Sequence, residues 1–175
     1  MMVRGGDSSG MRELYSRYAG YLTAVCSRFI PDRDEVKDVL QDSFVKVFTN
    51  FDSFSFKGEG SLRAWVRKIT VNESLKALRK DRRLTALPVN MVDMEDEEEE
   101  VPFGDVPQSV IQDMIRRLPD GYRTVFNLYV FENMKHKEIA ELLGIKEDSS
   151  ASQLLRAKAM LAREIKEYQR RKDNE

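Results

Sequence analysis

Apolar side chains recur along most of this chain at intervals of three and four residues, the spacing of amphipathic helices. No segment alternates apolar and polar positions over the length that a strand needs. The pattern predicts helices over residues 11–30, 33–51, 62–83, 108–118 and 121–131, followed by a helical hairpin. Asp32, Ser61 and Asp120 precede three of these helices and are predicted to cap them. The expected fold class is therefore all-α.

The third predicted helix differs from the others because it carries two apolar faces. Leu62, Trp65, Val66 and Ile69 share one face, whereas Val71, Leu75 and Leu78 lie nearly opposite. We therefore expect this helix to contact two different surfaces of its domain.

The last part of the chain has the layout of a helix-turn-helix. A short helix with buried Ile139 and Ala140 ends at Gly144, and a second helix follows with either Asp148 or Ser149 as its cap. The apolar stripe of that helix, which includes Leu155, is predicted to face inward. Four polar residues are predicted on the opposite, outward face: Ser149, Ser152, Gln153 and Arg156. Such side chains can bond base edges and phosphates in a DNA major groove. The alternative is an ordinary helical hairpin of a protein core.

Charge divides the chain into segments. Residues 1–10 are rich in Gly and Ser and are predicted to form a flexible tail. Residues 11–83 form a basic helical block, and residues 108–175 form a second, with net charge +2. Between them, residues 84–107 contain eight acidic and no basic residues, together with three prolines, which predicts an extended acidic linker. The whole-chain net charge of -1 conceals this polarity.

The same composition argues against several classes of protein. No apolar run approaches the roughly 20 residues that span a bilayer, and no signal peptide is evident, so we expect a cytoplasmic protein without membrane insertion. Cys26 is the single cysteine and is predicted to be a core thiol. His136 is the single histidine and is expected at the surface. Neither a metal cluster nor a catalytic triad is supported, and we expect no cofactor and no small-molecule substrate.

Residues 57–83 combine positive charge with nearby aromatic side chains. This segment contains nine basic and three acidic residues, a net charge of +6. Together with Phe54 and Phe56 in the preceding loop, it could neutralise phosphates and stack an unpaired base. The competing interpretation places the aromatics in the core and the charges on a solvated face. For Trp65 the core is favoured, because it shares the apolar stripe of its helix, whereas for the two loop phenylalanines both interpretations stay open.

Four motifs in succession resemble one family. Residues 38–44 (DVLQDSF), 58–69 (GEGSLRAWVRKI) with Asn72, 118–126 (LPDGYRTVF) and 136–145 (HKEIAELLGI) are similar to those of extracytoplasmic-function sigma factors of bacterial RNA polymerase. The resemblance covers residues 11 to about 170 in the family's order. It implies a non-catalytic protein that directs core RNA polymerase to promoter DNA and assists DNA melting. An anti-sigma factor is a further implied partner.

The resemblance also implies roles for individual residues. Asp38, Gln41 and Asp42 would dock on the clamp of the core polymerase. The −10 promoter element would be held by seven residues: Phe54, Phe56, Lys57, Arg63, Asn72, Lys76 and Arg79. The −35 element would be read by Ser149, Ser152, Gln153 and Arg156. Ser150 and Ala151 replace the β-branched residue and lysine that family members often carry, which puts these −35 contacts in doubt.

Two other functions compete with that of a sigma factor. The chain could be an autonomous helix-turn-helix regulator that binds an operator as a dimer, although the acidic clamp-like face argues against it. It could also be a helical interaction protein, which would leave the basic third helix without a role.

The acidic linker also has two possible roles. It could occupy a basic polymerase channel that nascent RNA later enters, or it could simply be a soluble tether.

Overall fold

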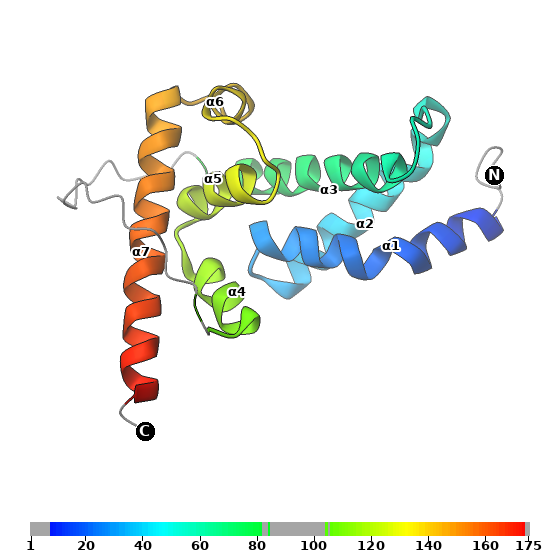
Figure 1. The fold of residues 1–175 in the computed structure, drawn as a ribbon. Helices are drawn as coiled ribbons and strands as arrows, with labels where there is room; N and C mark the ends of the chain where they lie inside the picture. The colour runs from blue at the N-terminus through cyan, green and yellow to red at the C-terminus, as the bar shows by residue number, and fades with distance from the viewer. Residues whose placement is uncertain (1–7, 82–83, 85–103, 105, 174–175) are drawn as a thin grey trace. The chain divides into compact units, whose positions relative to one another are not determined.

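The structure, a computed structural model, describes residues 8–81, 84, 104 and 106–173 (Figure 1). Every regular element in these ranges is helical, so the all-α prediction is confirmed. The helices are α1 (Ser8–Phe29), α2 (Arg33–Thr49), the 3-10 turn η1 (Phe51–Ser53), α3 (Ser61–Lys80), α4 (Gln108–Arg117), α5 (Asp120–Val130), α6 (His136–Leu143) and α7 (Glu147–Asp173). None of these described helices is both long enough and apolar enough to cross a membrane. The chain divides into two compact units, Met1–Asp81 and Arg82–Glu175.

The predicted ends of several segments need correction. Helix α1 begins at Ser8, so residues 8–10 belong to a helix and not to the predicted tail, whose remainder lies outside the described residues. Helix α3 ends at Lys80, three residues before the predicted end. Most of the predicted acidic linker also lies outside the described residues, and its extended form stays a prediction.

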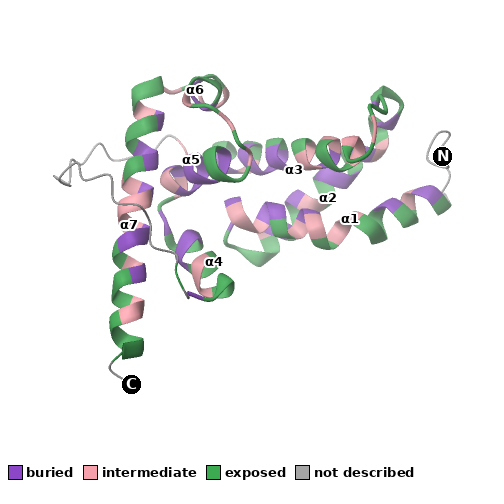
Figure 2. Cartoon of the chain, in the orientation of Figure 1, coloured by how far each residue is buried: buried purple, intermediate pink, exposed green. Residues whose placement is uncertain are grey.

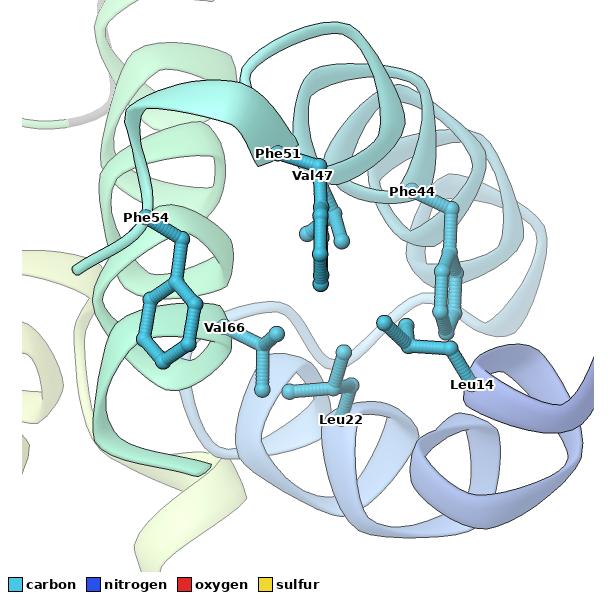
Figure 3. Packing of buried hydrophobic residues seen from close by; sticks show 7 residues of the cluster. All are labelled: Leu14, Leu22, Phe44, Val47, Phe51, Phe54 and Val66. Carbon is cyan, nitrogen blue, oxygen red and sulfur yellow. The ribbon is translucent and has the colours of Figure 1, made fainter. Parts of the chain in front are cut away.

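Helices α1, α2 and α3 of the first unit pack on one another in all three pairs. A cluster of buried side chains fills the space between them, as Figure 3 shows: Leu14, Leu22, Phe44, Val47, Phe51, Phe54 and Val66. Burial of a side chain of this size stabilises the folded state by about 1.5–3 kcal/mol. Because α3 contacts both α1 and α2, the prediction of two buried faces on this helix is confirmed.

A buried thiol connects the same three helices. Cys26 of α1 is inaccessible to solvent, its Sγ lies 4.0 Å from the Val36 carbonyl oxygen, and the Ser74 hydroxyl donates to Sγ at 3.5 Å. Burial raises the pKa of the Cys26 thiol to about 11. The prediction of a core thiol at this position is therefore confirmed.

The predicted helix caps are right in one case and wrong in two. Asp32 caps α2, because its Oδ1 accepts hydrogen bonds from the backbone N–H groups of Asp34 at 3.0 Å and Glu35 at 2.8 Å. The residue before α3 is Gly60, whose φ of 81° favours glycine, and Ser61 already lies within the helix. Pro119 likewise precedes α5, so Asp120 belongs to its first turn.

In the second unit, α7 packs on α4, α5 and α6. Figure 2 shows buried and exposed residues alternating along α7, as expected for a helix that packs with one side. A buried arginine organises the turn between α4 and α5. Arg123, with 2% of its surface exposed, donates to the carbonyl oxygens of Arg116 at 3.1 Å and Leu118 at 2.7 Å, and it pairs with Asp120. These bonds satisfy carbonyls that the end of α4 leaves unpaired.

Candidate nucleic-acid interface

Helices α6 and α7 form the predicted helix-turn-helix. Gly144 ends α6 with a φ of 69°, a left-handed conformation that glycine adopts without strain, and Ile145 N–H returns to the Ala140 carbonyl at 3.1 Å. Helix α7 begins at Glu147, before both predicted cap residues, so the predicted caps at Asp148 and Ser149 are wrong. It continues to Asp173, which makes it 27 residues long.

His136 joins three helices of the second unit. Its ring stacks on Tyr129 of α5, with 4.8 Å between ring centres, and its Nδ1 lies 3.0 Å from Oγ of the buried Ser150 on α7. The ring is half-buried, so the expectation of a surface histidine needs correction. This contact fixes the start of α7 against α5 and α6.

The outward face of α7 differs from the predicted one at two positions. Ser152 is exposed, and Ser149 and Arg156 are partly exposed, as expected. Gln153, however, is only 7% exposed, and its Oε1 has no hydrogen-bond partner among the described residues, so its predicted outward position is wrong. Leu155 is 36% exposed although the pattern placed it inside. Helix α7 packs on both α5 and α6, so a single apolar stripe does not describe its buried side.

The two phenylalanines of the loop before α3 differ in their exposure to solvent. Phe54 is 6% exposed and packs on Trp65, with 5.2 Å between ring centres, and on Phe51 at 5.9 Å. The structure thus favours the core interpretation for Phe54, and its predicted contact with a promoter base is not compatible with this burial. Phe56 is 66% exposed and can offer a ring face to a ligand. Trp65 packs against the core cluster, as predicted.

Helix α3 presents a polar stripe to solvent. Asn72 and Lys76 are exposed one turn apart, and the exposed Arg79 continues the stripe. Lys68 is exposed one turn before Asn72 and belongs to the same face, although the sequence prediction omitted it. Its i,i+4 spacing from Asn72 was the signal that would have found it. Arg63 lies near the start of α3, where its guanidinium covers the Tyr21 ring at 4.2 Å.

A buried carboxylate lies behind this stripe. The Glu73 side chain is 4% exposed and forms ion pairs with Lys46 of α2 and Lys76 of α3, the latter at 3.7 Å. In the sequence, Glu73 is one of the three acidic residues of segment 57–83, and nothing in its spacing indicates a partner on another helix. The ion pairs show that Lys46, 27 residues away, is its neighbour in space.

Helix α2 exposes an acidic face. Asp38, Gln41 and Asp42 are all exposed, as predicted, and Val45 continues the face with 54% of its surface exposed. Asp34, one turn earlier, accepts a hydrogen bond from Lys37 at 2.7 Å, which lowers the pKa of its carboxyl, and the adjacent ammonium offsets part of its negative charge. Among the described residues no salt bridge engages Asp38 or Asp42.

Comparison with known proteins assigns this arrangement to a family. Residues 14–84 match sigma-70 region 2, and residues 108–161 match sigma-70, region 4. The ECF RNA polymerase sigma-E factor of Haemophilus influenzae is 26% identical over 93% of this chain and 91% of its own length. The ECF RNA polymerase sigma factor SigW of Bacillus subtilis is 25% identical over 94% of each chain.

The chain belongs to the ECF sigma factors. A solved structure of the sigma factor RpoE in complex with the anti-sigma factor NepR from Bartonella quintana supports the fold, with a TM-score of 0.53 at 19% identity over 89% of this chain and 96% of that one. This ECF sigma factor directs RNA polymerase to promoters and is a non-catalytic subunit of that enzyme. The sigma-factor prediction is confirmed over the operator-binding regulator and the helical interaction protein.

Proposed function

We propose that this ECF sigma factor uses three separate surfaces, one to bind core polymerase and two to bind promoter DNA. The acidic face of α2 docks on core polymerase, the loop and stripe of α3 hold the −10 element, and the exposed side of α7 reads the −35 element. One observation carries the proposal: in each region, polar or aromatic side chains stay exposed beside neighbours that are buried.

The proposed polymerase-docking surface consists of Asp38, Gln41, Asp42 and Val45. Its carboxylates would attract a basic partner surface, which increases the rate of encounter and fixes the register. Val45 supplies an exposed apolar side chain within this polar face, and such a group gains free energy when a partner covers it. The expected contact is therefore a mixed one, with an apolar contact inside a charged rim.

The proposed −10 surface begins at Phe56 and runs along α3. Phe56 takes over the base-stacking role that was open to either loop phenylalanine, because Phe54 belongs to the core. Lys57 is exposed next to it, and four exposed residues follow on the helix: Lys68, Asn72, Lys76 and Arg79. Extruding a base costs a few kcal/mol, which stacking on an aromatic ring offsets by about 1–3 kcal/mol. This surface would assist melting by binding the separated strand.

The proposed −35 surface on α7 consists of Ser149, Ser152 and Arg156. The Ser152 hydroxyl donates to the Asp148 carbonyl at 2.8 Å, which leaves its oxygen able to accept from a base or to exchange partners. Arg156 supplies the positive charge one turn later. Gln153 could contribute only if its side chain moved outward from the buried position.

A reconstituted transcription system tests the three assignments separately. D38K/D42K should abolish binding to core polymerase, whereas F56A and R156A should bind core as the wild type does. R156A should weaken binding of the holoenzyme to duplex promoter DNA, and F56A should allow that binding but reduce permanganate-reactive open complex. E13Q, on exposed Glu13 of α1, serves as a control. The assignment fails wherever a variant loses a different step from the one stated.

A protein that masks one of these surfaces would keep this sigma factor inactive. The solved relative in complex with an anti-sigma factor supports such a partner for this chain. We place the protein in the cytoplasm, where the polymerase and promoter DNA are. Co-purification of a partner that dissociates when core polymerase is added would test the masking.

A further inference from the structure

The Lys46–Glu73–Lys76 cluster joins α2 and α3 beneath the proposed −10 surface. Glu73 is enclosed, with 4% of its side chain exposed, but the two lysine side chains remain 47% and 68% exposed. Lys46 binds one carboxylate oxygen, and Lys76 approaches the other at 3.7 Å. Both ammonium groups are therefore open to a ligand from solvent, although the carboxylate between them is not.

A carboxylate between the two lysines weakens the attraction of their ammonium groups for a phosphate. A buried charge needs compensating charge, and here the compensation comes from side chains that are themselves near the DNA-facing stripe. A phosphate that approaches Lys46 or Lys76 has to share that lysine with Glu73. Each contact then contributes less than a lysine with no acidic neighbour would contribute.

We propose that Glu73 is an internal counterion that weakens phosphate binding by Lys46 and Lys76, and that Lys46 is part of the DNA-binding surface. The proposal rests on the −10 surface described above. Phosphate contacts add affinity for any sequence and carry no sequence information. By weakening two of them, Glu73 lowers binding to random DNA while the contacts to promoter bases stay unchanged, and this raises the ratio of specific to non-specific binding.

The test measures binding of the full-length chain to a random-sequence single-stranded oligonucleotide at a series of KCl concentrations. Each phosphate contact to a single strand changes the slope of log K against log[KCl] by about 0.7. E73Q should steepen the slope by up to about 0.7, because one carboxylate offsets at most one lysine charge, and tighten binding roughly three- to tenfold at low salt. The gain should disappear in E73Q/K46Q/K76Q.

Matched controls separate this effect from a general change of charge or of fold. E13Q removes the same charge from an exposed position on α1 and should leave the slope unchanged. The fluorescence of Trp65, the single tryptophan, reports whether the first unit of each variant is folded. K76Q alone provides a measurement that does not alter Glu73. Its slope should fall by clearly less than 0.7, because Glu73 already neutralises part of that lysine.

An unchanged slope in E73Q, an equal gain in the triple variant, or a full 0.7 loss in K76Q would each overturn the counterion proposal. Transcription by the reconstituted holoenzyme distinguishes this failure from a broader one. If F56A impairs open-complex formation but E73Q shows no change in salt dependence, only the counterion proposal fails and the −10 surface stands. If F56A leaves open-complex formation unchanged, the proposed −10 surface itself fails.

Discussion

Replacing each loop phenylalanine by alanine should separate stability from promoter melting. Phe54 is 6% exposed and lies against Trp65 and Phe51, so F54A removes a buried ring and two aromatic contacts. Truncation of a buried phenylalanine costs about 3–5 kcal/mol, and we expect about 3 kcal/mol here because the loop can partly close over the space. Phe56 is 66% exposed, and F56A should change the free energy of unfolding by less than about 0.5 kcal/mol.

Urea unfolding followed by Trp65 fluorescence measures this difference in the correct unit. The single tryptophan lies in α3, in direct contact with Phe54, so its signal reports the first unit and not the second. With an m-value of about 1 kcal/mol/M for a unit of this size, F54A should lower the urea midpoint by about 3 M. F56A should leave the midpoint in place and reduce open-complex formation by the holoenzyme.

The opposite pattern would refute the reasoning. If F56A lowered the midpoint and F54A did not, the burial assigned to the two rings would be wrong. If F54A lowered the midpoint but F56A melted promoters as the wild type does, the fold would stand and the stacking role of Phe56 would fail. A conservative F56Y variant, which keeps the ring, should restore most of the melting.

Four further predictions concern single residues. R123M should destabilise the second unit by about 3 kcal/mol, because it leaves helix-end carbonyls and an aspartate without their buried partner, and far-UV circular dichroism of thermal unfolding would show it. Q153L should stabilise the same unit by about 1 kcal/mol in the same assay, because the Oε1 atom of Gln153 is buried without a partner. D32A should cost about 1 kcal/mol of the first unit's stability, measured by tryptophan fluorescence in urea, because the capping bonds of α2 are lost. Cys26, with a pKa of about 11, should be only about 0.1% thiolate at pH 8; a disulfide reagent should label it in urea and far more slowly in buffer, and rapid labelling of the folded chain would contradict its burial.

Helix positions, the two blocks and the helix-turn-helix could be predicted from sequence because each depends on local spacing. The i,i+3 and i,i+4 pattern identifies a helix without knowledge of its neighbours, and Gly144 marks the end of α6 by its conformation alone. Caps were harder. Ser61 and Asp120 are good capping residues, but Gly60 and Pro119 before them set the helix starts one residue earlier.

Exposure within a helix or loop could not be predicted so well, because it depends on packing between elements. Phe54 and Phe56 are two residues apart in an irregular loop, where no period distinguishes an inward from an outward side chain. On α7, a single stripe fitted to the apolar residues placed Gln153 outside and Leu155 inside. Both placements are wrong, and α7 packs on α6 as well as on α5, which a pattern fitted to one stripe does not take into account.

The charge available on the surface also depends on packing between helices, and a count along the sequence does not show it. A count over residues 57–83 gives +6 and treats every lysine there as available to DNA. Glu73 contributes -1 to that sum as if it were a distant surface group, yet it lies inside the unit in contact with Lys76, and it also engages Lys46 from outside the counted segment. Because Glu73 is shielded from solvent, its interaction with these two exposed lysines is screened less than an interaction between two fully exposed charges. On the proposed −10 surface, the charge offered to DNA would therefore depend on which lysines share a carboxylate, and this pairing across 27 residues becomes visible only when α2 and α3 are brought together.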